Sequence, residues 1–288
     1  MAYLLILLSV ITGLIEGTVI KKYNARHEKG GFLFTSLISL FSMMFFVVNG
    51  LLDGGLHFSL SLLPYGLIAG FLYCTASFLT YVALSCGAFA PSMLVLSYSV
   101  VFSILYGLFW LDEPANVFTY IGLAIVMLTL YLVRGKSDGE QKKVSLKWLL
   151  CIGYSVFASG MFSVISRIQQ VSFDDQFRNE YMIIALGFSF VVLFVAGLCK
   201  DGKDLPYILR HGALYTVGAG VANGACNALG FLIFSLMPVS LSSPITAAVK
   251  IVVSYLISRF VFRETFLTRQ LIGILLGIVA VVFLNIQI

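Results

Sequence analysis

The chain has 288 residues, of which 60% are hydrophobic and 11% are charged. In a soluble protein about a quarter of the residues are charged, so this composition excludes a soluble enzyme, a disordered chain and a nucleic-acid-binding domain. The net charge of +5 does not alter that conclusion, because the basic residues lie between apolar runs. Inside a bilayer only helices or a closed barrel satisfy the backbone, and long unbroken apolar runs favour helices.

Hydropathy predicts an all-α membrane protein of ten transmembrane helices. The runs cover 2–20, 32–52, 62–84, 89–111, 116–133, 148–166, 181–198, 212–236, 239–258 and 267–286. Lysines follow the first run, and no small-residue cleavage site follows it. We therefore expect a transmembrane helix there, with a signal peptide as the alternative. No metal-ligand spacing and no nucleophile–base pair stands out, so we expect no metal, no cofactor and no enzyme.

The order of elements predicts a duplication. The longest hydrophilic connection separates residues 1–134 from residues 148–288 and leaves 135–147 as a cytoplasmic linker. A shift of 151 residues places Glu113 on Glu264 and Gly122 on Gly273. Five helices per repeat is an odd number, so the second copy must insert upside down, which is a common arrangement in transporters.

Basic residues predict the orientation in the membrane. Fifteen lysines and arginines fall in the connections after odd-numbered helices, whereas only Arg167 and Arg178 fall on the opposite side. Basic residues concentrate on the cytoplasmic side of membranes. This bias predicts that both termini lie outside.

The paired ends of the fourth and ninth predicted helices carry a family resemblance. Ala90-Pro91-Ser92 leads into the fourth helix and Asp112-Glu113-Pro114 closes it, while Ser242-Ser243-Pro244 leads into the ninth and Arg263-Glu264-Thr265 closes it. With the ten helices, these features resemble the drug/metabolite transporter superfamily, most closely its EamA-type branch. The resemblance implies secondary transport by alternating access through a cavity between helices three, four, eight and nine. Many members carry both termini in the cytoplasm, and the charges here predict the reverse.

Away from their first and last turns, the predicted spans contain two charges, Glu16 and Lys250. A charge at a helix centre costs about 2.5–3.5 kcal/mol on insertion scales, so both should face the protein interior or a wet cavity. Lys250 either binds an anionic group of a substrate or neutralises Glu16. Its surroundings resemble those of phosphate-sugar and nucleotide-sugar transporters, but their Lys-Arg or Asn-Lys pairs are absent from Val249-Lys250-Ile251.

Glu16 lies between Gly13 and Gly17, a spacing that permits close helix packing. It resembles the first-helix glutamate that small multidrug members of the superfamily use for proton coupling. Glu16 therefore either couples transport to a proton or cation, or serves as a structural partner of a basic residue.

Further polar residues could line the cavity or simply pack. Thr246 and Ser254 share a helix face with Lys250, four residues to either side. The remaining candidates are Asn223, Asn227, Tyr73, Tyr81 and Tyr98. Arg167, at the end of the sixth helix, could guide anions or cap a helix. Trp110 and Trp148 lie at span ends, where tryptophans anchor helices at the membrane interface.

These patterns predict a secondary active transporter that moves a small polar metabolite, anionic or zwitterionic, by alternating access. The alternative is an exporter of cationic or aromatic compounds, or of amino acids, held by a tyrosine-lined cavity. A membrane-embedded enzyme and a non-transporting membrane protein are further alternatives. We expect a bacterial plasma (inner) membrane location, a monomer or homodimer, and as partners a small-molecule substrate, a coupled proton or cation and membrane lipid, but no nucleic acid.

Overall fold

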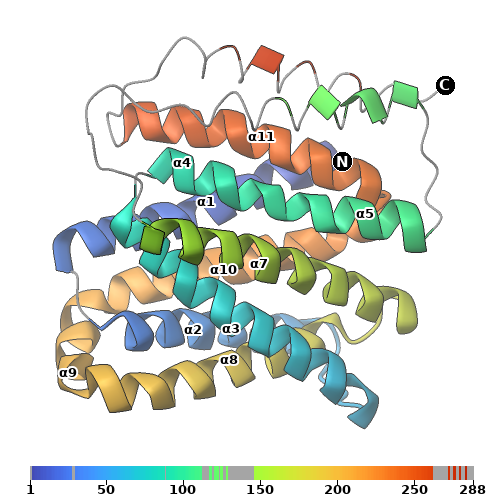
Figure 1. Cartoon of the computed structure of the whole chain (residues 1–288). Helices are drawn as coiled ribbons and strands as arrows, with labels where there is room; N and C mark the ends of the chain where they lie inside the picture. Colours follow the sequence, from blue (N-terminus) through green and yellow to red (C-terminus); the bar gives the residue numbers. More distant parts are fainter. Residues whose placement is uncertain are drawn as a thin grey trace.

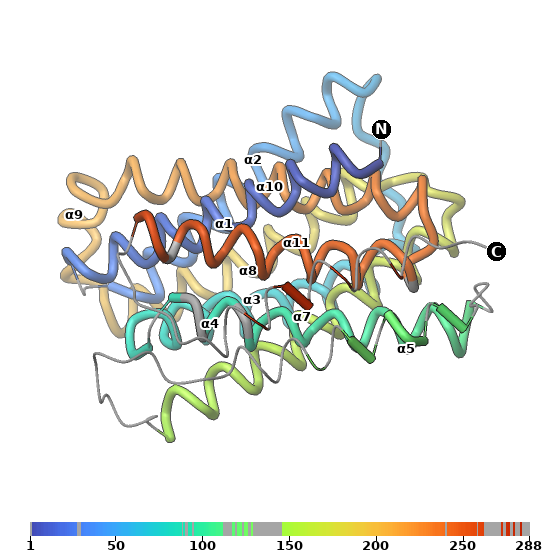
Figure 2. Tube along the Cα trace, turned by 90° about the horizontal axis from the view of Figure 1, so that it is seen from above, coloured from blue at the N-terminus to red at the C-terminus, as the bar shows by residue number. Residues whose placement is uncertain are grey.

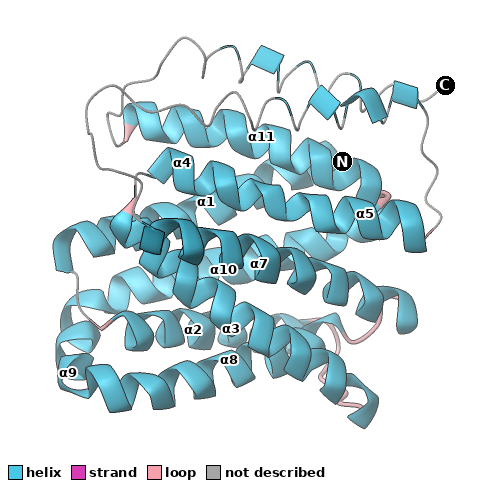
Figure 3. Ribbon diagram, in the orientation of Figure 1, coloured by secondary structure: helices cyan, strands magenta, loops and turns pink. Residues whose placement is uncertain are grey.

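The structure is a computed structural model, and it describes residues 2–27, 30–87, 89–111 and 146–261, with isolated residues between 117 and 128 and between 272 and 283. The linker 135–147 and the turns 112–114 and 263–265 lie wholly or mainly outside the described residues, as do most of the predicted spans 116–133 and 267–286. Within the described ranges every regular element is helical, as the sequence predicts (Figure 3).

The helices follow the apolar runs closely. They are α1 (Ala2–His27), α2 (Gly31–Leu52), η1 (Leu60–Leu62), α3 (Leu63–Cys86), α4 (Phe89–Leu96), η2 (Ser97–Ser99), α5 (Val100–Trp110), α7 (Leu146–Ser172), α8 (Arg178–Asp201), η3 (Gly202–Asp204), α9 (Leu205–Tyr207), η4 (Ile208–Gly212), α10 (Ala213–Leu236) and α11 (Val239–Phe260). By length and composition, five segments of the described chain could cross a membrane: Ala2–His27, Gly31–Leu52, Leu60–Cys86, Leu146–Ser172 and Arg178–Leu236. The protein is therefore a helical, multi-pass membrane protein.

The described helices differ from the predicted spans at several places. Arg178–Leu236 contains both 181–198 and 212–236, because the short helices η3, α9 and η4 join α8 to α10 without an extended residue. The predicted span 89–111 is instead divided by the 3₁₀ turn η2. Helices α1 and α7 run several residues past their apolar runs, since a helix can continue into polar surroundings where hydropathy no longer marks it.

The helices cross the molecule in roughly one direction, which defines two ends (Figures 1 and 2). At the α9 end, α1 and α11 finish and α7 and α10 begin. Helices α5, α7 and α10 end at the α5 end, and the N-terminus lies towards the same end (Figure 1). The described basic residues of the helix termini and turns gather at the α9 end, apart from Arg167 and Arg178 at the α5 end.

Helices α3 and α10 make equivalent close contacts. Helix α3 packs on α8, and α10 packs on α2. A Cβ added at Gly70 of α3 would lie 2.7 Å from the Ala185 carbonyl oxygen, and one added at Gly220 of α10 would lie 2.8 Å from that of Ile38. Glycine is needed at both positions because a neighbouring backbone occupies the space of a side chain.

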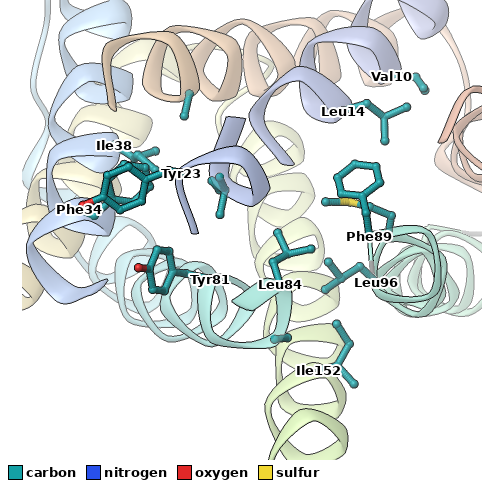
Figure 4. Close-up of a cluster of buried hydrophobic side chains, with 14 of the residues drawn as sticks. Val10, Leu14, Tyr23, Phe34, Ile38, Tyr81, Leu84, Phe89, Leu96 and Ile152 are labelled. Carbon is teal, nitrogen blue, oxygen red and sulfur yellow. The ribbon is translucent and has the colours of Figure 1, made fainter. Parts of the chain in front are cut away.

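A buried apolar cluster fills the bundle from the α9 end to the level of Val10 and Ile233. Figure 4 shows side chains from α1, α2, α3, α4 and α7 converging there. Among its members are Leu14, Tyr23, Phe34, Tyr81, Leu84, Phe89, Leu96 and Ile152. Trp148 packs against this cluster and its Nε1 donates to Ser92 Oγ at 3.1 Å, so it is not simply an interface anchor, whereas Trp110 is 75% exposed.

Candidate functional site

A cavity of about 220 Å³ lies between α1, η2, α5, α7, α10 and α11. Hydroxyl groups dominate its polar lining: Ser9, Ser97, Ser99, Ser103, Ser163, Ser166, Ser243 and Thr246. The lining residues come from the first half of α1 and of α11 and from the second half of α7 and of α10. The cavity is therefore displaced towards the α5 end, and the apolar cluster closes the bundle on its other side.

The 3₁₀ turn η2 shapes one wall of this cavity. A 3₁₀ segment inside a longer helix changes the direction of the side chains and often marks a functional position. Here it brings Ser97 and Ser99 to the cavity, and Ser103 of α5 follows. In the second half of the chain α11 passes the cavity as a continuous helix, despite Pro244.

Lys250 is the charged residue among those that line the cavity. The single ion pair in the described part of the chain joins Arg178 to Asp175, so Glu16 and Lys250 do not make a salt bridge within 4.0 Å. Lys250 also makes no hydrogen bond with a described residue. Its ammonium group thus lies beside an open volume without a direct ionic partner, a costly arrangement unless a ligand completes it.

The lining hydroxyls mostly present oxygen lone pairs to the cavity. Ser97 donates to the Met93 carbonyl at 2.9 Å, Ser163 to the Ser159 carbonyl at 3.1 Å, and Thr246 to the Ser242 carbonyl at 2.7 Å. Since each hydroxyl has one hydrogen, these three oxygens can only accept further hydrogen bonds. The cavity therefore combines one cation with a wall of acceptors.

Glu16 lies in a separate polar cluster beside the cavity, which we call the Glu16 cluster: Glu16, Ser42, Tyr73, Asn223 and Asn227. Asn223 Nδ2 donates to Glu16 Oε2 at 3.0 Å. Asn223 Oδ1 accepts from Ser42 Oγ at 2.8 Å, from Tyr73 OH at 2.8 Å and from Asn227 Nδ2 at 3.1 Å. One side-chain amide thus joins α1, α2, α3 and α10.

Asn227 connects this cluster to the cavity. Its Nδ2 donates to both the carbonyl and the side-chain oxygen of Asn223, at 3.0 and 3.1 Å. With Nδ2 turned to Asn223, the Asn227 amide oxygen is available to a cavity occupant.

The sequence-predicted residues fall into three groups. Lys250, Asn227 and Thr246 line the cavity. Glu16, Asn223 and Tyr73 belong to the Glu16 cluster and are not among the lining residues. Tyr81, Tyr98 and Ser254 lie elsewhere: Tyr81 is a member of the apolar cluster, Tyr98 packs against it, and Ser254 is 4% exposed and donates to the Ile251 carbonyl at 2.9 Å.

Sequence reasoning missed the serines of the cavity wall. Serine is common in membrane helices, so single serines carry little information. The spacing of Ser155, Ser159, Ser163 and Ser166 along one face of α7 was the available signal, and Ser163 and Ser166 of this row reach the cavity. In the described part of the chain no group of three or more metal-ligating side chains occurs.

Comparison with known proteins identifies a fold but no activity. No model of a protein family matches the chain, and no curated protein matches it. Among solved structures, one described only as "Crystal structure of protein" superposes with a TM-score of 0.65, covering 98% of this chain and 97% of that chain at 16% sequence identity. At this identity the similarity establishes a shared fold alone.

Proposed function

We propose that the protein is a secondary active transporter whose cavity binds a small carboxylate that also carries hydroxyl or ammonium groups. The observation that carries this proposal is Lys250, an ammonium group without a counter-charge within 4.0 Å in a cavity otherwise lined by neutral side chains. The carboxylate of the substrate supplies the missing counter-charge. Its hydroxyl or ammonium hydrogens donate to the oxygens of Ser97, Ser163 and Thr246.

The cavity size supports a small substrate. Drug-sized ligands occupy pockets of about 300–1,000 Å³, whereas this cavity has about 220 Å³. The tyrosines on which the aromatic-exporter alternative rests, Tyr73, Tyr81 and Tyr98, are not among the lining residues, so the described geometry favours the anionic or zwitterionic substrate.

Packing of the helices supports an inverted duplication and membership of the drug/metabolite transporter superfamily. If α1, α2, α3 and α5 correspond to α7, α8, α10 and α11, exchanging the halves preserves the main packing pairs. The exchange turns the packed pair of α1 and α10 into the pair of α7 and α3, which also packs in the structure. It likewise turns the pair of α2 and α10 into the packed pair of α8 and α3. The close contacts of Gly70 and Gly220 follow the same exchange, and Ser39 Oγ meets Ser189 Oγ at 3.1 Å where α2 and α8 cross.

The position of the cavity supports alternating access. The apolar cluster separates the cavity from the α9 end, and the lining residues lie nearer the α5 end. A carrier must expose its binding site to each side in turn. We therefore infer a second state in which the packing of α4 against α1 and α7 loosens and the α9 end opens.

We further infer that the α9 end, with most of the basic residues, faces the cytoplasm of a bacterial plasma membrane, so that both termini lie outside. Single cysteines placed at Lys142 and Asn116, in a cysteine-free background, test this orientation. Both positions lie outside the described residues; the sequence places Lys142 in the linker and Asn116 at the start of the span 116–133, on opposite sides of the membrane. Labelling of position 142 by an impermeant maleimide in intact cells would reverse the orientation.

A binding screen tests the proposed function. Purified protein is melted with hydroxycarboxylates, amino acids, sugar phosphates, neutral sugars and organic cations, and Lys250→Met serves as the matched control. A ligand present at a hundredfold excess over its Kd adds about 2.7 kcal/mol of stability. We expect a small carboxylate to stabilise the wild type and not the variant. Equal stabilisation of both proteins, or stabilisation by neutral or cationic compounds alone, would contradict the proposal.

A further inference from the structure

A second pocket of about 290 Å³ lies at the α5 end, between α7 and the turn that joins α10 to α11. It is lined by Arg167 and by residues 234–238. Phe234 also lines the central cavity, as does Ser166, the neighbour of Arg167 on α7. The two volumes thus lie one behind the other along α7 and α10, with Phe234 between them.

Arg167 has unused hydrogen-bonding capacity in this pocket. One amino group, Nη1, donates to the Phe234 carbonyl at 3.2 Å, while the buried Nε has no hydrogen-bond partner in the described part of the chain. A guanidinium group offers five N–H donors. Among the described residues no carboxylate forms an ion pair with Arg167. The other arginine of this end, Arg178, pairs with Asp175 at 3.4 Å.

We propose that the Arg167 pocket is the outer entrance of the central cavity, where the guanidinium group attracts anions that then pass Phe234 and reach Lys250. Both cations lie along one path from the α5 end, and the ligand chemistry is the same at each, namely a small carboxylate or another compact anion. The proposal rests on the proposed function only in taking the Lys250 cavity as the destination.

Capping of α10 is the competing explanation for Arg167. The Phe234 carbonyl lies in the last turn of α10, where a cation interacts favourably with the helix dipole. A cap requires the hydrogen bond to Phe234, whereas an anion-attracting entrance requires only the positive charge. A lysine at this position would keep the positive charge that an entrance requires, but not the guanidinium hydrogen bond on which a cap depends.

Cys226 provides a probe that does not depend on the identity of the substrate. Its side chain lines the central cavity with Lys250. In the test protein Cys74, Cys86, Cys151 and Cys199 are replaced by alanine, which leaves Cys226 as the reactive thiol. The rates of modification by anionic 2-sulfonatoethyl and cationic 2-(trimethylammonio)ethyl methanethiosulfonate are then compared, with the reagents added at the side that the α5 end faces.

The expected result is a preference for the anionic reagent that Arg167→Gln lowers about tenfold, in the range of electrostatic steering effects. Arg167→Lys should keep most of the preference, and the matched control Arg178→Gln should leave it unchanged. An unchanged preference in Arg167→Gln, or equal loss in Arg167→Lys and Arg167→Gln, would overturn the proposal, as would a Cys226 thiol that neither reagent reaches from that side. Substrate binding that depends on Lys250 would still support the proposed function in each case.

Discussion

The Glu16 cluster and the Lys250 cavity lie side by side, yet they use polar side chains in opposite ways. In the cluster, Asn223 receives three donors on one oxygen and gives one hydrogen to Glu16, so neighbouring helices satisfy one another. In the cavity, Lys250 forms no ion pair within 4.0 Å with a described residue, and the lining oxygens still have lone pairs to offer. The comparison indicates that polar side chains whose hydrogen bonds are satisfied within the protein serve a structural role, whereas those with unsatisfied donors or acceptors form a ligand site.

Removing the charge of the cavity should have the largest effect on binding and almost none on folding. Lys250→Met takes away the counter-charge for the substrate carboxylate, a loss that typically costs about 2–5 kcal/mol, or at least thirtyfold in Kd. The thermal midpoint should stay constant or rise, because a charge without a direct ionic partner is removed from the membrane interior. Calorimetric titration with the compound found in the binding screen, together with thermal unfolding, measures both quantities. A large fall in the midpoint would instead assign Lys250 to the structural cluster.

Removing the centre of the cluster should have the converse effect. Asn223→Ala leaves Ser42, Tyr73 and Asn227 without their shared acceptor and Glu16 without its donor. Hydrogen bonds between membrane helices average about 0.6 kcal/mol each, so the loss of this set should destabilise the protein by about 2–3 kcal/mol. Thermal unfolding in detergent measures the change, with Asn227→Ala as a milder control. An unaltered midpoint would show that the cluster is not what holds α1, α2, α3 and α10 together.

Glu16→Gln should alter pH dependence more than stability. The amide oxygen of glutamine can still accept from Asn223, so we expect a destabilisation of about 1 kcal/mol or less. An ionised Glu16 weakens the attraction of Lys250 for an anion, because its negative charge partly cancels the positive potential in the cavity. Protonation of Glu16 removes that negative charge, so the wild type should bind anions more tightly as pH falls. The variant should bind at every pH as the wild type does at low pH, because glutamine cannot ionise.

Binding measured across pH 5–9 tests this expectation, and Lys250, Cys226 and Tyr73 are the other titratable groups that face Glu16 from the described helices. A pH profile that persists unchanged in Glu16→Gln would assign the dependence to one of these groups and remove the coupling role of Glu16.

Tyr73→Phe should have the smallest effect. It removes one of the three donors to the Asn223 oxygen, and Ser42 and Asn227 remain in place to satisfy that acceptor. We expect a change in the free energy of unfolding of less than about 1 kcal/mol and no change in substrate affinity. A loss of affinity matching that of Lys250→Met would move Tyr73 from the cluster into the binding site.

Within the described residues the sequence predicts where most helices lie, because apolar length is a local property. It also identifies Glu16 and Lys250, since charges are conspicuous in apolar runs. It cannot separate Asn223 from Asn227, which share one face of α10, because that distinction depends on which neighbouring helix each side chain reaches. Nor does it predict that Ser97 and Ser99 enter the cavity on a 3₁₀ turn, since the tertiary contacts that favour this turn come from other helices.

Trp148 gives the protein an optical reporter of its own conformation. The chain has two tryptophans, and they lie at opposite ends of the bundle: Trp110 is 75% exposed, while Trp148 is packed at the α9 end and hydrogen-bonded to Ser92. Indole emission shifts to longer wavelength when the ring enters a more polar environment. In a Trp110→Phe background, a red shift on addition of substrate would therefore record the separation of α7 from α4 directly, without an attached label.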